Sequence, residues 1–235
     1  MKIEKIALIV AGGTGTRMGN QLPKQFLEVA GRPLLMHTLA LFSHFDPSAR
    51  LLLVLPESHH ALWQELCRQY GFNLPHRVIG GGHTRFHSVK NGLEATEGDG
   101  IVFIHDGVRP LVSPETLSRC LETALIHGNA IPAVPVSESV RQCDEAFPKG
   151  GPSHPVDRSR LVLIQTPQTF RLSLIRQAYQ QDDSPEFTDD ASVLEKTGTI
   201  IRLVEGNREN IKITWPADLR LAEALLKENF LHFQS

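Results

Sequence analysis

The sequence predicts an α/β fold built on a mostly parallel sheet with helices on both faces. Short runs rich in branched aliphatic residues alternate with longer stretches of helical period, a pattern typical of repeated βα units. Most of the aliphatic runs show no polar alternation, as expected for strands covered on both faces. With 235 residues, 41% of them hydrophobic and 21% charged, the chain is long enough to bury a large core as a single domain, 1–235.

Six central strands are expected, and the ends of several helices are marked by proline, threonine or glycine. The strands are 6–10, 51–55, 101–105, 130–136, 161–165 and 200–204. Proline at a first-turn position predicts helix starts at Pro33, at Pro114 after the N-cap Ser113, and at Pro216, with Thr84 and Thr188 as further caps. Glycine predicts helix ends at Gly71 and Gly128.

One segment, residues 137–160, breaks this alternation. It has few apolar positions, and its stretch 147–155 reads Phe-Pro-Lys-Gly-Gly-Pro-Ser-His-Pro, which suits neither a helix interior nor a central strand. We expect this segment to project from the domain or to loop, because long segments of this kind are usually functional or mobile. A disordered surface insertion is the alternative.

Charge and cysteine content exclude several classes of function. Lys and Arg total 24 against 26 Asp and Glu, so no global positive field is present to hold nucleic acid or an anionic membrane. The three cysteines are far apart and form no C-x-x-C pair, which argues against a disulfide framework or a structural zinc. The first ten residues are too short for a signal or membrane segment, so we expect a cytoplasmic protein.

A glycine-rich segment directly follows the first expected strand. It reads Ala11-Gly12-Gly13-Thr14-Gly15-Thr16-Arg17-Met18-Gly19 and is followed by Pro23-Lys24-Gln25. At the carboxyl edge of a parallel sheet, glycines let backbone N–H groups approach an anion closely, which predicts a phosphate cradle assisted by Arg17 and Lys24. The spacing fits neither a Walker loop nor G-x-G-x-x-G. A tight turn without a ligand is the alternative.

Two further segments carry chemistry at expected strand ends. The strand 101–105 runs into Asp106 and Arg109, a carboxylate and a guanidinium suited to magnesium and phosphate, although Asp106 as a turn cap is the alternative. The segment 80–88 reads Gly-Gly-Gly-His-Thr-Arg-Phe-His-Ser, and its glycines are expected to leave room for a flat base. His83 and His87 stand at i, i+4 but lack the other features of a zinc site.

Six motifs in order give the chain a specific resemblance. They are the glycine loop with Arg17, Pro-Lys-Gln at 23–25, His-Asp-x-x-Arg-Pro at 105–110, Val-Asp-Arg at 156–158, Thr-Pro-Gln at 166–168 and Asn-Ile-Lys at 210–212. Over nearly its whole length the chain resembles the cytidylyltransferases that act on small polyol phosphates, most closely the branch using 2-C-methyl-D-erythritol 4-phosphate. The resemblance implies a Rossmann-like nucleotidyltransferase fold and a homodimer formed through an arm at 137–160.

The resemblance also implies an activity and residue roles. The reaction would join CTP and methylerythritol phosphate into CDP-methylerythritol and pyrophosphate, in non-mevalonate isoprenoid biosynthesis, with Mg²⁺ required. Nucleotide binding would fall to Ala11, Gly12, Gly13, Thr14, Gly15, Gly82, Ser88 and Asp106, with Asp106 also on magnesium; catalysis to Arg17, Lys24 and Lys212; and the sugar phosphate to Arg109, Ser139, Arg158 and Thr166.

Chemistry alone is consistent with this assignment, and three alternatives stay open. One anion must attack the α-phosphorus of another, so positioning and charge neutralisation matter and no protein nucleophile is required. The related ribitol 5-phosphate cytidylyltransferases also have Ala-Gly-Gly at the start, as at residues 11–13. A non-catalytic nucleotide-binding module would not need Lys212 or Asp106. A dinucleotide-dependent oxidoreductase is disfavoured by the glycine spacing.

Overall fold

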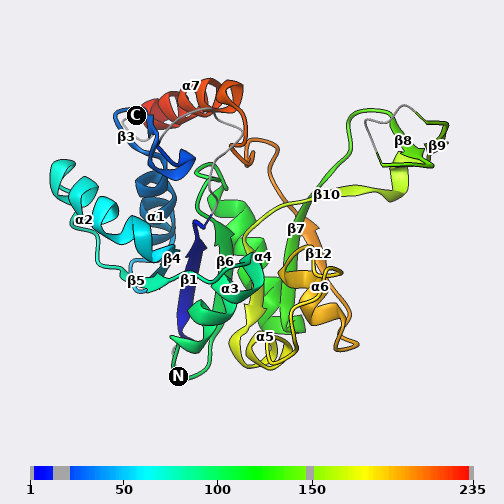
Figure 1. The fold of residues 1–235 in the computed structure, drawn as a ribbon, viewed down its shortest axis with the longest axis horizontal. Helices are drawn as coiled ribbons and strands as arrows, with labels where there is room; N and C mark the ends of the chain where they lie inside the picture. The colour runs from blue at the N-terminus through cyan, green and yellow to red at the C-terminus, as the bar shows by residue number, and fades with distance from the viewer. Residues whose placement is uncertain (1–2, 13–21, 147–150, 233–235) are drawn as a thin grey trace.

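The structure, a computed structural model, describes residues 3–12, 22–146 and 151–232. These residues form a central sheet of strand order β10-β7-β11-β6-β1-β4-β5, with β12 paired to β7 (Figure 1). The strands are β1 (Lys5–Val10), β4 (Arg50–Leu55), β5 (Arg77–Gly80), β6 (Ile101–Asp106), β7 (Asn129–Pro135), β10 (Val162–Ile164), β11 (Gln168–Arg171) and β12 (Leu203–Glu205). The pairs β1–β4, β1–β6, β4–β5 and β7–β12 are parallel, while β10 and β11 run antiparallel to their neighbours.

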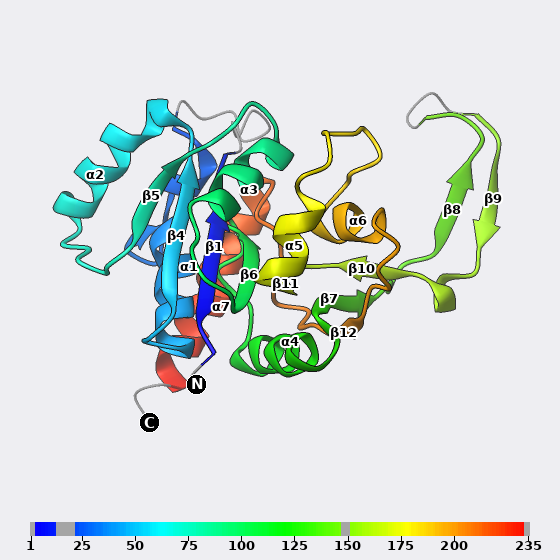
Figure 2. The same ribbon diagram turned by 90° about the horizontal axis from the view of Figure 1, so that it is seen from below.

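Helices cover both faces of the sheet because successive strand residues point to opposite sides. Ile6 and Leu8 of β1 share a buried cluster with α3 (Arg85–Glu94), α5 (Leu172–Ala178) and α6 (Asp190–Glu195). Ala7 and Ile9 join the opposite cluster with α1 (Leu34–Phe45), α2 (His60–Gln69) and α4 (Pro114–His127) (Figure 2). The predicted fold class, a mostly parallel sheet between two helical layers, is therefore confirmed.

A third, smaller cluster lies beyond the carboxyl edge of the sheet, where α7 (Pro216–His232) packs (Figure 1). It joins Leu226 of α7 to Val29 of the short hairpin β2 (Glu28–Val29) and β3 (Arg32–Pro33), and to Ile213. Two short 3-10 helices, η2 (Lys24–Phe26) and η3 (Glu57–His59), flank this edge. Across the described residues, every helix is too short or too polar to cross a membrane.

Most of the expected helix ends are found, and one is displaced. The Ser113 side chain accepts from the Thr116 amide at the start of α4, and Gly128 ends that helix in a left-handed conformation. Thr84 caps α3 as expected. The expected cap Thr188 is wrong by one residue: Asp189 caps α6, because its carboxylate accepts from the Ser192 amide while the Ser192 hydroxyl accepts from the Asp189 amide.

Two of the six strands expected to be central are not central. In β10 the exposed fractions of Val162, Leu163 and Ile164 are 43%, 55% and 39%, because the strand lies at the outer edge of the sheet beyond β7. The strand expected over 200–204 begins only at Leu203, whose side chain is 52% exposed. The apolar composition of these two segments correctly predicted strand conformation. It did not predict that helices would leave these strands exposed.

The segment 137–160, called the arm below, leaves the sheet and projects as a hairpin. Strand β8 (Val140–Cys143) pairs antiparallel with β9 (Ser153–Val156), and the 3-10 helix η4 (Arg158–Arg160) follows. Both ribbon views show the arm standing away from the helices and the sheet (Figures 1 and 2). Pro155 is accommodated because the hairpin has only two strands, so each has a free edge.

Candidate active site

The ends of β1 and β6 bring two of the predicted motifs together. The strands are parallel neighbours with Val10 opposite Asp106, so Ala11 and Gly107 follow at the same edge. Glycine at 107 allows a close approach, because a Cβ there would lie 2.9 Å from the Ala11 Cβ and 3.0 Å from Leu35 Cδ1. The close approach places the first residues of the glycine-rich segment beside the Asp106 turn.

Asp106 is the centre of a compact charged cluster. Its Oδ2 lies 3.1 Å from Lys212 Nζ and 3.2 Å from Arg109 Nε, and its side chain is only 11% exposed. Burial alone would raise the pKa of this carboxyl, but the nearby cations of Lys212, Arg85 and Arg109 lower it well below its usual range. Asp106 is therefore ionised throughout the physiological range, and two cations meet on one of its oxygens.

Below this cluster, the buried His105 ties Thr166 to the Arg109 turn. Its Nε2 lies 2.8 Å from the Arg109 carbonyl oxygen, and its Nδ1 lies 3.1 Å from Thr166 Oγ1. Burial lowers the pKa of His105 to about 4, so the ring is neutral at pH 7. Since a carbonyl only accepts, Nε2 carries the proton and Nδ1 accepts from the Thr166 hydroxyl. Thr166 Oγ1 also accepts from the Asp106 amide at 3.1 Å.

The chain segment that carries Lys212 is held at both ends. On one side, the buried Asn210 donates from Nδ2 to the Thr166 carbonyl at 2.8 Å, and its own carbonyl accepts from Arg109 Nη1 at 2.8 Å. On the other side, the Ile213 carbonyl accepts from Lys24 Nζ at 2.9 Å. This arrangement fixes the backbone around Lys212 and brings the Pro-Lys-Gln and Asn-Ile-Lys motifs to the same edge.

The segment 80–88, called the base loop below, runs from the end of β5 through a loop into the first turn of α3, and it meets the glycine-rich segment at Ser88. The Ser88 hydroxyl accepts from the Gly82 amide at 3.0 Å and donates to the Thr84 carbonyl at 2.9 Å. A Cβ on Gly12 would lie 3.8 Å from Ser88 Oγ, so these two loops are in contact range. A Cβ on Gly82 would lie 2.3 Å from His87 Cβ; glycine at 82 therefore lets the loop pack closely on α3.

The structure brings most of the described candidate residues to one edge. Asp106, Arg109, Thr166 and Lys212 are linked directly. Gly12 and Gly82 lie on adjoining loops, Lys24 begins η2, and Ser88 lies in the first turn of α3. Ala11 joins them through its carbonyl, which accepts from the buried Gln25 side chain at 3.0 Å. Gly13, Thr14, Gly15 and Arg17 lie outside the described residues.

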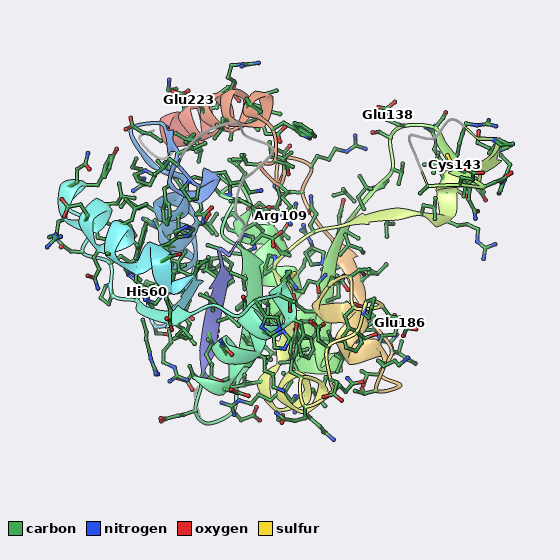
Figure 3. All side chains as sticks on the ribbon, in the orientation of Figure 1. His60, Arg109, Glu138, Cys143, Glu186 and Glu223 are labelled. Carbon is green, nitrogen blue, oxygen red and sulfur yellow. The ribbon has the colours of Figure 1, made fainter. Side chains whose placement is uncertain are left out.

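Ser139 and Arg158 are not joined to this cluster in the described part of the chain. Both are exposed in the arm, where Arg158 donates to the Ser137 carbonyl. Figure 3 shows Glu138, next to Ser139, out in the arm and far from Arg109 at the sheet edge. Within the isolated chain, the two predicted sugar-phosphate ligands of the arm therefore do not complete the site.

Sequence reasoning missed several residues that organise the site. His105 and Asn210 stood inside quoted motifs, but neither was given a role. Arg85 and the fully buried Asp190 form a two-point ion pair between the base loop and α6, with Nη1–Oδ1 and Nη2–Oδ2 distances of 2.8 and 2.6 Å. The available signal was an arginine in a glycine-rich loop and a pair of aspartates at a helix start, which separately indicate a surface residue and a cap.

The carboxyl edge of this open sheet combines glycine-rich loops, clustered cations and a buried carboxylate. This combination is typical of one class of protein, the α/β nucleotidyltransferases. The family model of 2-C-methyl-D-erythritol 4-phosphate cytidylyltransferase (IspD) matches residues 5–228. The chain therefore belongs to the IspD family.

Individual relatives agree over nearly the whole chain. The 2-C-methyl-D-erythritol 4-phosphate cytidylyltransferase of Porphyromonas gingivalis is 52% identical over 228 residues, 96% of this chain and 99% of that protein. The protein of the same name from Bacteroides fragilis is 51% identical over 222 residues, 94% of this chain and 99% of that protein. The crystal structure of the Thermus thermophilus protein aligns with a TM-score of 0.77 at 34% identity, covering 97% of this chain and 100% of that chain.

Proposed function

We propose that this protein transfers the cytidylyl group of CTP to 2-C-methyl-D-erythritol 4-phosphate, giving CDP-methylerythritol and pyrophosphate in isoprenoid biosynthesis. Family membership over nearly the whole chain supports the reaction. The observation that carries the chemistry is the cluster of Asp106, Arg109 and Lys212 at the carboxyl edge of the sheet.

The reaction needs charge stabilisation rather than a protein nucleophile. A phosphate oxygen of the polyol phosphate attacks the α-phosphorus of CTP, and the bond from that phosphorus to the bridging oxygen of pyrophosphate breaks. Lys212 lies on the segment between Asn210 and Ile213, and Lys24 is bonded to the Ile213 carbonyl, so both cations are aimed at the same edge. Together with Arg17 they would neutralise the negative charge that develops on the transferred group and on pyrophosphate.

Magnesium is the cofactor that we propose. Asp106 fits the ion as one hard carboxylate ligand, because Mg²⁺ is commonly held by one or two carboxylates together with substrate phosphates. The described residues include no group of three or more His, Cys, Asp or Glu able to hold a metal ion, so substrate phosphates would have to supply further ligands. When bound, the ion would supply a positive charge to the triphosphate and withdraw electron density from it.

Substrate recognition is divided between the base loop and the two arginines of the sugar-phosphate set. We expect Gly82 and Ser88 to read the cytosine, and Ala11 to Gly15 to hold the triphosphate. Arg109 is held by Asp106 and the Asn210 carbonyl, and it would meet the sugar phosphate together with Thr166. Arg158 and Ser139 would reach it only from the arm.

We further propose that the chain is one domain, 1–235, and works as a homodimer in which each arm serves the partner's site. The exposed apolar residues of β10, together with Leu161 just before it, lie where the arm returns to the sheet and offer a surface that a second copy would bury. The unpaired thiols of Cys67, Cys120 and Cys143 support work in a reducing compartment, the cytoplasm.

One substrate panel tests the assignment. Pyrophosphate release from CTP should require magnesium and methylerythritol phosphate, and should be absent with the polyol phosphate omitted. Ribitol 5-phosphate is the matched competitor, because it is also a small polyol phosphate. Turnover of ribitol phosphate without turnover of methylerythritol phosphate would move the protein to that activity, and CTP binding without release would indicate a binding module.

A further inference from the structure

An ion pair between α3 and α6 joins the two halves of the site, although neither of its residues has a role in the reaction proposed above. Arg85 is the first residue of α3, directly after the cap Thr84 of the base loop. Its guanidinium donates from two nitrogens to the two carboxylate oxygens of Asp190, at 2.8 and 2.6 Å. Asp190 is completely buried, and the Arg85 side chain is 34% exposed.

The Asp190 side of this pair continues to the strand that follows Thr166. Gln168 of β11 donates from Nε2 to Asp189 Oδ2 at 2.7 Å and accepts from the Ala191 amide at 2.8 Å. The start of α6 is therefore attached to β11 on both sides of Asp190. The ion pair, the first residues of α6 and the Gln168 side chain thus connect the base loop to the strand beside the expected sugar-phosphate site.

The Arg85 side of the pair also acts on the reaction centre electrostatically. Its positive charge is among those that lower the pKa of Asp106. A second tether runs parallel to it: the Thr84 hydroxyl donates to Asp183 Oδ2 at 2.9 Å. The base loop is thus held from outside by two carboxylates, one of them exposed to solvent and the other fully buried.

A buried ion pair is weak evidence for a stabilising role, because burying both charges costs about what their attraction returns. A two-point arginine–carboxylate contact does supply geometry, since its planar fork fixes both distance and rotation. Resting on the function proposed above, we infer that Arg85 and Asp190 are positioning residues that set the base loop against the sugar-phosphate half of the site. Selection of cytosine over uracil therefore depends on this pair.

The decisive variant is Arg85→Lys, which keeps the positive charge and loses the two-point contact. We expect its dissociation constant for CTP, measured by calorimetry with magnesium, to rise about tenfold, and the preference for CTP over UTP to fall by a similar factor. Turnover at saturating CTP should change far less. Asp190→Asn should behave in the same direction; should it fail to fold, Arg85→Lys decides the question.

Tyr179→Phe is the matched control for stability. The Tyr179 hydroxyl donates to Asp190 Oδ1 at 2.6 Å from the core side, so its removal weakens support of the same carboxylate and leaves the arginine contact in place. We expect a lower melting temperature with CTP affinity and base preference unchanged. If Tyr179→Phe lost as much CTP affinity as Arg85→Lys, the pair would be structural only, and the inference would be wrong.

Ser88→Ala separates this inference from the proposed function. If Ser88→Ala loses CTP affinity while Arg85→Lys keeps wild-type affinity and base preference, the positioning role of Arg85 and Asp190 is wrong. The proposal that the base loop reads the cytosine is then retained. If both variants bind CTP as the wild type does, the proposed base loop is itself wrong and the positioning role fails with it. Loss in both, with Tyr179→Phe unaffected, supports the positioning role.

Discussion

The sheet edge around Asp106 and the arm both carry residues expected at the same site, yet they are built in opposite ways. At the edge, the Asp106 side chain is 11% exposed and pairs with Lys212, while Arg109 and Lys24 donate to backbone carbonyls of residues 210 and 213. In the arm, Arg158 is exposed and its described hydrogen bond goes to a carbonyl of the same arm. Preorganised charge lowers a reaction barrier without reorganisation, whereas a projecting hairpin acts only where another surface meets it.

The largest effect should come from the preorganised region, through Lys212→Ala. Turnover should fall roughly 100-fold or more, because one cation placed on developing charge commonly contributes about 3 kcal/mol. The fold should persist, since the Lys212 side chain is 47% exposed. Steady-state kinetics and thermal melting measure the two halves of this prediction, and Lys24→Ala should give a loss of similar size.

Lys227→Ala is the matched control, because this lysine is also exposed and ion-paired, with Glu223 of α7. It should keep wild-type turnover. Near-full turnover in Lys212→Ala would mean that the charged cluster at the sheet edge is not the part of the protein that stabilises the transition state.

The second prediction tests whether the arm acts on a partner. Lys24→Ala and Arg158→Ala should each be inactive as homodimers. When the two variants are unfolded and refolded together in equal amounts, half of the dimers should be mixed. One site of each mixed dimer then combines an intact Lys24 with an intact Arg158, so roughly a quarter of wild-type activity should return.

Recovery of activity shows which site the arm serves. If the arm served its own subunit, every site of a mixed dimer would still carry one of the two substitutions, and no activity would return. Mixed dimers have to be shown directly, for example by two different affinity tags. Activity that stays at the level of the separate variants, with mixed dimers present, would contradict the shared site and make the arm a surface hairpin.

The preorganised region was also the more predictable from sequence. Strands β1 and β6 are continuous aliphatic runs that end in glycine or in charged residues, and parallel strands place such ends at one edge. Asp106, Arg109 and the glycines could therefore be expected together. Lys24 was expected there from its position just downstream of the glycine-rich segment. The joining of Lys212 to that edge came from the resemblance, since nothing in its local sequence indicates how distant segments pack.

What sequence could not predict depends on tertiary packing. The apolar run of β10 reads as a buried strand, yet it lies exposed at the sheet edge, because composition does not say which surface covers a strand. Tyr179 and Asp190 gave no signal for their contact, which joins α6 to the end of α5. The arm's composition predicted a projection, but the pairing of β8 with β9 was missed because its residues carry little alternation.

The third prediction uses pH to compare the two regions. Burial lowers the pKa of His37 and of His105 to about 4. The unfolded chain takes up these protons near the ordinary value of 6.5, so between pH 6.5 and 4 it binds more protons than the folded chain. Stability should therefore fall as the pH falls, by up to about 1.4 kcal/mol per pH unit for each histidine.

His37→Gln should flatten this slope by about one histidine's share, measured by urea unfolding between pH 5 and 7. A His154→Gln variant, at an exposed position of the arm, is the control for the histidine-to-glutamine change itself. An unchanged slope in His37→Gln would show that burial at this position does not make the sheet region acid-sensitive.

The smallest effect should come from an ion pair within the arm. Asp144 and His154 lie 3.6 Å apart with both side chains more than half exposed, so Asp144→Asn should change the free energy of unfolding by less than about 0.5 kcal/mol. Asp46 is the matched carboxylate of the body: it pairs with Lys5, its side chain is 14% exposed, and it accepts from the Ser48 amide at 2.8 Å. Asp46→Asn should cost clearly more, because it removes a hydrogen-bonded partner from a mostly buried lysine. Equal losses in the two variants would mean that exposure does not separate the two contacts, and the contrast between a preorganised body and an exposed arm would fail.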